Sequence, residues 1–147
     1  MPEQRLHKAK RVVVKLGSNV ITAVNSLNID VIDSISRQIS ALMDMGIEVI
    51  LVSSGAMAAG LRKMGMDRRP DEIPKRQAIS AIGQGGLMNA YEKSFARHGK
   101  RIAQILLTGE DLNNRKRYLN ARNTINMLME WREVTRLNEK ETVGGDK

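Results

Sequence analysis

The stretch IEVILVSSGAMAAG, residues 47–60, decides the fold predicted for this 147-residue chain. Its first six residues are almost continuously apolar, two serines and a glycine then interrupt the run, and a helix-forming stretch follows. A continuously apolar strand is typical of a parallel sheet whose two faces are both covered by helices. Residues 47–52 are therefore predicted to be a buried strand that leads through a tight turn into a helix.

Two other stretches, RVVVKL (11–16) and IAQILL (102–107), repeat this pattern and also end at polar, glycine-containing turns. Apolar residues at three- and four-residue spacing predict helices between and after the strands. These helices are expected over residues 28–46, 56–65, 72–99 and 114–131. The third helix is expected to be interrupted near its glycines at 83, 85 and 86. The order of elements predicts a layered α/β domain with right-handed crossovers.

Composition limits the chemistry open to this chain. It has no cysteine, which excludes disulfides, thiolate metal sites and thiol catalysis. Its two histidines, His7 and His98, lie far apart without metal-ligand spacing, so no structural zinc site is expected. No apolar run approaches the roughly 20 residues that span a bilayer, which predicts a cytoplasmic location without a membrane partner.

The net charge of +8 results from 24 Lys and Arg residues against 16 Asp and Glu residues. Such a charge suits either nucleic acid or an anionic small molecule. The basic residues are scattered, and aromatic residues make up only 3%, so the stacking platforms of single-strand binders are missing. Nucleic-acid binding is therefore the disfavoured alternative.

Polar turns follow the first two predicted strands, at the edge of a parallel sheet where ligands bind. In KLGSN (15–19), Lys15 stands inside an apolar strand, where it costs desolvation energy unless it meets an anion. In SSGAMAAG (53–60), the turn leads into a helix, so its N–H groups and hydroxyls could cradle a carboxylate or a phosphate. The structural alternatives are a lysine that snorkels to solvent and a plain serine N-cap with a glycine turn.

Three familiar signatures are absent. The chain has no P-loop motif and no G-x-S-x-G nucleophile motif. The dinucleotide fingerprint fails at GQGGLM (83–88), because Met88 takes the place of the third glycine and a helical pattern precedes it.

Five stretches in one register from Arg11 to Val143 resemble a known family. They are VVVKLGSNVIT, VILVSSGAMAAG, AIGQGGLMNAYEKSF, QILLTGEDLNNRKRYLNARNTI and LNEKETV. Together they resemble the N-terminal part of the bacterial glutamate 5-kinases (γ-glutamyl kinases) of the amino acid kinase family. The resemblance implies an α/β fold, an αβα sandwich with a parallel-rich sheet, of which this chain would hold the N-terminal half.

The resemblance also implies an activity. Family members transfer the γ-phosphoryl group of ATP, with Mg²⁺, to the side-chain carboxylate of L-glutamate, the first step of proline biosynthesis. By matching residues, Lys15, Gly17 and Ser18 would bind the ATP phosphates, and Lys15 would be catalytic because it stabilises charge on the transferring group. The residues that would hold glutamate are Ser54, Gly55, Ala56, Asn138 and Glu141. No protein ligand for the metal is identified, and a homo-oligomer is expected.

Residues 134–147 depart from the family pattern. The family has an apolar strand of the type V-P-I-I followed by N-E-N-D, whereas this chain has VTRL followed by NEKE. Arg136 therefore falls inside the strand, and Lys140 and Glu141 replace the second asparagine and the aspartate. A buried arginine without a partner is strongly unfavourable. This segment is therefore predicted to be a divergent tail that forms no well-protected central strand.

The resemblance covers residues 10–133 well, but the family's kinase domain continues about as far again, and many members add a PUA domain. Residues 1–147 are therefore expected to hold the N-terminal part of the kinase domain and no PUA domain, and the short chain is predicted to be inactive by itself. The alternative is a noncatalytic half-domain that acts by dimerising or by associating with a complete kinase subunit.

Overall fold

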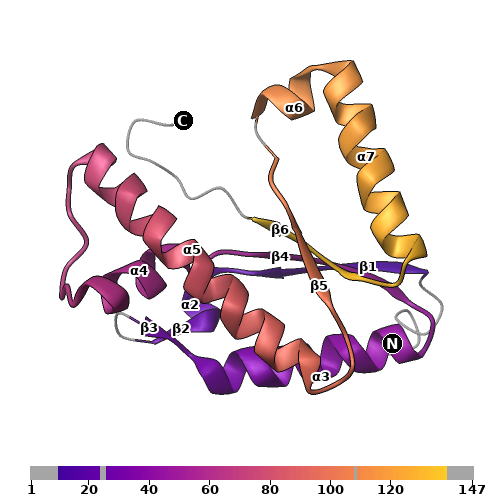
Figure 1. Ribbon diagram of the computed structural model, residues 1–147, viewed down its shortest axis with the longest axis horizontal. Helices are drawn as coiled ribbons and strands as arrows, with labels where there is room; N and C mark the ends of the chain where they lie inside the picture. Colours follow the sequence, from indigo (N-terminus) through magenta and orange to yellow (C-terminus); the bar gives the residue numbers. More distant parts are fainter. Residues whose placement is uncertain (1–9, 24–25, 108, 139–147) are drawn as a thin grey trace.

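The computed structural model describes residues 10–23, 26–107 and 109–138. The strands are β1 (Arg11–Leu16), β2 (Thr22–Ala23), β3 (Ser26–Leu27), β4 (Glu48–Ser53), β5 (Ile102–Ile105) and β6 (Val134–Asn138). The helices are α2 (Ser18–Ile21), α3 (Ile29–Asp44), α4 (Ala56–Met64), α5 (Ile73–Ala96), α6 (Gly109–Asn113) and α7 (Arg115–Glu130). Four parallel strands form one sheet in the order β1-β4-β6-β5, and β2 pairs with β3 in a separate antiparallel ribbon (Figure 1).

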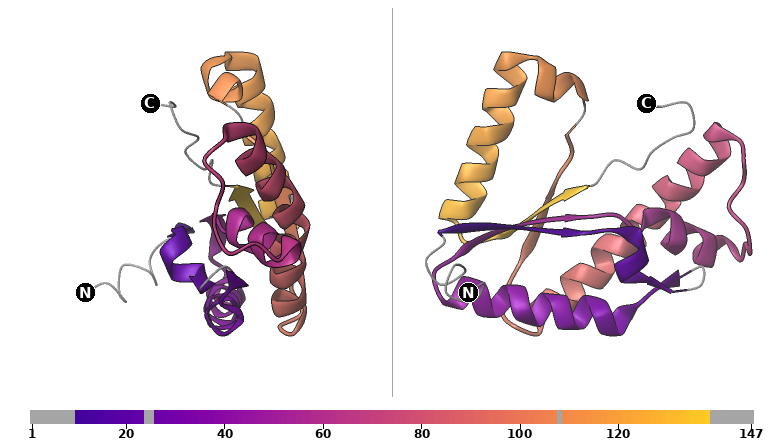
Figure 2. Two further views of the ribbon diagram at one scale, coloured as in Figure 1. Left: turned by 90° about the vertical axis from the view of Figure 1, so that its left-hand side faces the viewer. Right: turned by 180° about the vertical axis from the view of Figure 1, so that it is seen from behind.

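Helices cover both faces of this sheet, which makes it the middle layer of a sandwich (Figures 1 and 2). On one face, α3 and α5 enclose the core, where Val49 and Leu51 of β4 pack with Leu87, Tyr91 and Phe95 of α5. On the other face, α7 lies over Ile50, which stands between Val49 and Leu51 in β4. The αβα arrangement predicted from the sequence is therefore confirmed.

The helix predicted over residues 28–46 forms because both of its ends carry the expected signals. The Asn28 side chain accepts a hydrogen bond from the Val31 N–H at 3.3 Å, and Asp30 lies in the first turn. The helix ends before Gly46, whose φ is +85°. Its buried residues recur at three- and four-residue spacing, namely Ile32, Ser36, Ile39, Ser40 and Met43.

A polar contact joins α3 to α5 at the side of the core. Asp33 accepts a hydrogen bond from the Ser94 hydroxyl at 2.7 Å and forms an ion pair with Arg97 at 2.9 Å. The Ser94 hydrogen bond, followed by the Arg97 guanidinium, lowers the pKa of the Asp33 carboxyl below its usual value.

This contact predicts a pH-dependent contribution of Asp33 to stability. Because the pKa of Asp33 is lower in the folded chain than in the unfolded chain, its stabilising effect is present above about pH 4 and is lost as the pH falls through the folded value. The melting temperature of the Asp33→Asn variant should therefore fall less steeply with acidification than that of the parent. Asp71→Asn, which changes an exposed carboxylate, is the control. Parallel acid profiles for the parent and Asp33→Asn would contradict this account.

The helix predicted over residues 72–99 is α5, and the interruption predicted at its glycines is wrong. A Cβ atom at Gly83 would overlap the carbonyl oxygen of Ala56 and lie 2.5 Å from the backbone nitrogen of Gly60. A Cβ atom at Gly60 would in turn overlap the carbonyl oxygen of Ile79. These two glycines therefore let α4 and α5 cross backbone to backbone, and their purpose is packing rather than a break in the helix.

The prediction that the strands are buried on both faces holds for β4 but is wrong for β1. Val12 and Val14 pack on the core, whereas Val13 on the opposite face is 61% exposed. The reason is position, because β1 is an edge strand of the sheet within the described residues. β5, the other edge strand, ends at Ile105, so Leu106 of the predicted strand lies outside it and is exposed.

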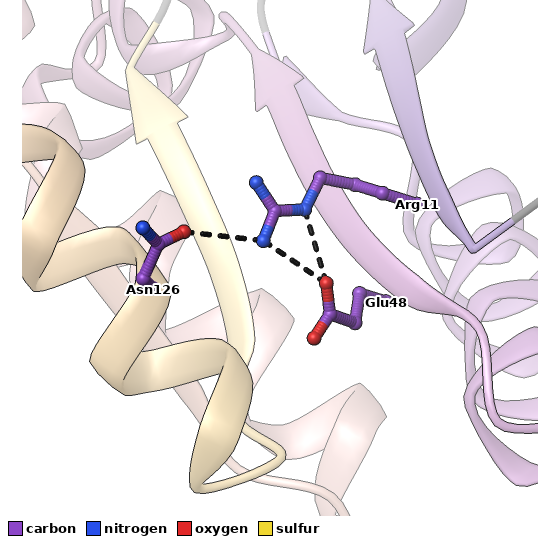
Figure 3. A network of polar contacts seen from close by, with 3 residues as sticks. All are labelled: Arg11, Glu48 and Asn126. Atoms are coloured by element: carbon purple, nitrogen blue, oxygen red, sulfur yellow. Dashed lines mark hydrogen bonds and ion pairs between the residues drawn. The ribbon is translucent and has the colours of Figure 1, made fainter.

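The start of β1 is tied to β4 and to α7 by one polar network (Figure 3). The Arg11 guanidinium donates to Glu48 at 3.0 and 3.1 Å and to Asn126 of α7 at 3.2 Å. Arg11 and Glu48 face each other in the parallel register of β1 and β4. Both side chains are partly exposed, so the ion pair contributes at most about 1 kcal/mol.

The prediction that the segment from residue 134 forms no central strand is wrong for residues 134–138. These residues form β6, which pairs with β4 on one side and with β5 on the other. Val134, Thr135 and Arg136 are all fully buried. Residues 139–147, including the predicted site residue Glu141, lie outside the described residues.

No helix in the described part of the chain is long and apolar enough to cross a membrane.

Candidate functional site

The two polar turns found in the sequence meet at one edge of the sheet. The register of β1 and β4 places Leu16 beside Ser53, so the turns after both strands leave the sheet at the same level. The hydroxyls of Ser18 and Ser54 form a hydrogen bond of 2.7 Å between the turns. The structure thus joins the predicted phosphate-binding residues to the predicted glutamate-binding residues.

The turn after β4 has a backbone that requires glycine. Gly55 has a φ of +124°, and a Cβ atom there would lie 2.8 Å from the Ile21 side chain. The next residue, Ala56, starts α4, and its carbonyl oxygen touches Gly83 of α5. Ser54 is only 5% exposed. The predicted glutamate-binding turn is therefore held in place from several sides and offers a small, fixed surface.

Gly17 and Lys15 lie at the end of β1 in different surroundings. Gly17 precedes α2 in an extended conformation, and the space where its Cβ would stand is open for 4 Å. Lys15 is exposed and stands beside Val52 in the register, on the sheet face that also carries Val13. An open backbone next to a cation and a hydroxyl suits a phosphate group.

Asn138 is brought to the same edge by β6. It is the last residue of that strand and faces Ser53 in the register, so the ends of β1, β4 and β6 form a row of Leu16, Ser53 and Asn138. Its Oδ1 accepts a hydrogen bond from Arg136 at 3.1 Å. Asn138 therefore ends a strand next to β4, whose following turn carries the predicted glutamate-binding residues Ser54, Gly55 and Ala56, and Glu141 lies outside the described residues.

Arg136 is the centre of a buried polar cluster that the sequence analysis did not foresee. Its Nε donates to the Ser53 hydroxyl at 3.1 Å, and its Nη2 donates to the Ser53 carbonyl at 3.3 Å. Its Nη1 donates to the side chains of Gln104 and Met88, and the Tyr91 ring lies 5.6 Å from the guanidinium carbon. The sequence feature that could have revealed this cluster is Gln104, a polar residue in an apolar strand. Gln104 faces Arg136 in the register of β5 and β6.

Burial shifts the pKa of both titratable side chains of this cluster, Arg136 and Tyr91. Desolvation lowers the pKa of Arg136, and the neighbouring Tyr91 acts in the opposite direction. Desolvation likewise raises the pKa of Tyr91, against the effects of Ser53 and Arg136. Because an arginine stays protonated near neutral pH, the cluster holds a buried positive charge below the row of strand ends.

The comparisons with known proteins agree with this geometry. The sequence model described as "Amino acid kinase family" matches residues 10–147. The chain belongs to the amino acid kinase family. Its predicted membership is thereby confirmed over the whole described structure.

Among the curated relatives in this kinase family are three named glutamate 5-kinase. The chain is 46% identical over 140 residues to the protein of Maridesulfovibrio salexigens, covering 95% of the chain and 37% of the relative. It is 49% identical over 143 residues to the protein of Syntrophotalea carbinolica, covering 97% of the chain and 38% of the relative. It is 47% identical over 135 residues to the protein of Thermus thermophilus, covering 92% of the chain and 36% of the relative. The chain thus spans well under half the length of these relatives.

A solved structure of isopentenyl phosphate kinase from T. acidophilum, in a product complex, shares the fold. The TM-score is 0.54, the sequence identity is 14%, and the match covers 89% of this chain and 57% of that one. This likeness supports the amino acid kinase fold and says nothing of the substrate.

The described residues contain no group of three or more His, Cys, Asp or Glu side chains that could hold a metal ion. Mg²⁺ in kinases is held largely by the substrate phosphates, one or two carboxylates and water. No ligand set for the metal is assigned among the described residues.

Proposed function

We propose that this chain is the substrate-binding half of a glutamate 5-kinase and that it is catalytically incomplete by itself. In this proposal residues 1–147 belong to the N-terminal part of one kinase domain. The relatives named glutamate 5-kinase support the reaction class. The single observation that carries the proposal is the hydrogen bond between Ser18 and Ser54, because it joins a phosphate-type turn to a carboxylate-type turn.

In the proposed reaction, a side-chain carboxylate oxygen of glutamate attacks the γ-phosphorus of ATP. The bond to the β–γ bridging oxygen breaks, and ADP leaves with that electron pair. Lys15, Gly17 and Ser18 would bind the phosphates, while Ser54, Gly55, Ala56 and Asn138 would hold glutamate, together with Glu141 beyond the described residues. Such transfer needs positioning and positive charge rather than a covalent nucleophile. Bound Mg²⁺ would neutralise charge on the phosphates.

The incompleteness follows from length. The chain spans 37% of the length of the Maridesulfovibrio relative, so more than half of that relative's residues have no counterpart in it. Orientation supplies much of the reduction of the barrier in phosphoryl transfer. We therefore expect substrate binding without turnover at the roughly 1–100 s⁻¹ typical of kinases.

A titration of the isotopically labelled chain with L-glutamate, followed by NMR, tests the proposal. Glutamate should shift the amides around Ser54 and Asn138, and Ser54→Ala should weaken binding by about tenfold or more, the effect of losing a hydrogen bond to a charged group. Thr124→Ala removes a hydroxyl from the exposed surface of α7 and should leave binding unchanged. Saturating glutamate without shifts at this edge, or equal affinities for both variants, would contradict the proposal.

A second candidate function is a noncatalytic half-domain that associates with a complete kinase subunit. The observation that favours it is the edge strand β1, whose Val13 is 61% exposed beside an unpaired strand edge within the described residues. If pairing through β1 occurs, a separately produced complete homologous kinase should co-elute with this chain. Val13→Lys should abolish that complex, and persistence of the complex in Val13→Lys would reject this route.

A further inference from the structure

Arg136 is fully buried, and its partners among the described residues are all neutral. Its N–H groups meet the hydroxyl and carbonyl of Ser53, the side-chain carbonyls of Gln104 and Asn138, and the sulfur of Met88. No ion pair between Arg136 and a carboxylate occurs within residues 10–138 as described. The hydrogen bonds remove the usual cost of an unsatisfied buried arginine, but no carboxylate among the described residues compensates its positive charge.

The contact with Asn138 fixes which end of that amide faces the site. Residues 136 and 138 lie on the same face of β6, because side chains two apart in a strand point the same way. The guanidinium is a donor without any acceptor, so the atom of Asn138 that faces it must be Oδ1, which accepts at 3.1 Å. The Nδ2 group is thereby directed away from Arg136 and is left to donate to another partner.

We propose that Arg136 is a positioning residue for the amino-acid site, holding Asn138 with its N–H donors toward the ligand and favouring a carboxylate over a carboxamide there. The inference rests on the proposed function. A fixed donor pair with a buried positive charge behind it favours an anionic acceptor, because both the hydrogen bonds and the field strengthen with negative charge on the ligand. A side-chain amide such as that of glutamine offers a neutral oxygen and competing donors. The expected consequence is discrimination between glutamate and glutamine.

The first measurement needs no ligand. The ¹⁵N order parameter of the Asn138 side-chain amide, assigned by its loss in Asn138→Ser, should be that of a rigid group in the parent and fall below about 0.6 in Arg136→Met. Arg136→Lys keeps the charge but lacks the planar fork, so the Asn138 amide should also become mobile in this variant. Arg37→Met removes one exposed charge from α3 and is the matched control, in which the amide should stay rigid.

The second measurement is the ratio of glutamate to glutamine affinity, from NMR titration of the same proteins. It should fall about tenfold in Arg136→Met, recover in part in Arg136→Lys, and stay unchanged in Arg37→Met. A rigid Asn138 amide in both Arg136 variants, or an unchanged ratio in Arg136→Met, overturns the inference. If Arg136→Met does not fold, the order parameter of the Asn138 side-chain amide in Arg136→Lys tests the inference instead. A parent chain that binds neither amino acid instead overturns the proposed function, and the discrimination falls with it.

Discussion

Replacing Gly83 by alanine is expected to destabilise this chain by about 3 kcal/mol or more, the upper range of overpacking effects. The added Cβ would overlap the Ala56 carbonyl oxygen and crowd the Gly60 nitrogen. Both are backbone atoms, so the clash cannot be relieved by a change of rotamer, and α4 would have to move away from α5. For a chain of this size, the melting temperature should fall by roughly 6–12 °C.

Gly85→Ala is the matched control for this prediction. Gly85 lies in the same helix, but no atom lies within 4 Å of the position its Cβ would take. Alanine there should be neutral or stabilise the helix by up to about 1 kcal/mol, because glycine is a poor helix former. Thermal unfolding of the two variants, followed by circular dichroism, checks the difference. Equal melting temperatures would show that α4 and α5 do not cross at Gly83.

Gly83→Ala should also weaken ligand binding at the candidate site. The Ala56 carbonyl oxygen that it would displace belongs to the first residue of α4, directly after Ser54 and Gly55. At a temperature where the variant is still folded, glutamate binding should therefore weaken, whereas Gly85→Ala should bind like the parent. Unchanged affinity in a folded Gly83→Ala variant would mean that the turn does not depend on the helix crossing.

Lys15→Ala is expected to reduce kcat/KM by about a hundredfold in a complete enzyme. The suitable protein is this chain fused to the C-terminal remainder of a relative such as the 47% identical kinase of Thermus thermophilus. In the proposed mechanism, Lys15 stabilises charge on the transferring phosphoryl group, and removing one such group costs on the order of 3 kcal/mol.

Lys63→Ala, in the last turn of α4, is the control that removes an equal charge away from the strand ends. Its steady-state constants for ATP and glutamate should stay near those of the fusion parent. Equal activity of the two lysine variants would return Lys15 to a side chain that reaches solvent from an edge strand.

Much of this architecture could be predicted from local sequence. The apolar runs at 11–16 and 47–52 and the Ser-Ser-Gly turn have signals that act over a few residues, and each lies where it was expected. That the two polar turns lie at the same edge of the sheet also followed from sequence, whereas the hydrogen bond between Ser18 and Ser54 is a finding of the structure.

The errors concern features set by contacts between distant segments. Whether Gly83 interrupts α5 or allows α5 to pack closely on α4 depends on the position of Ala56. Whether the Val13 side chain is covered depends on the place of β1 in the sheet. β6 has too few apolar residues to be recognised as a central strand by periodicity. Tertiary structure brings Ser53, Gln104 and Asn138 around Arg136, and because these acceptors satisfy the guanidinium, an apparently forbidden residue can occupy the middle of the sheet.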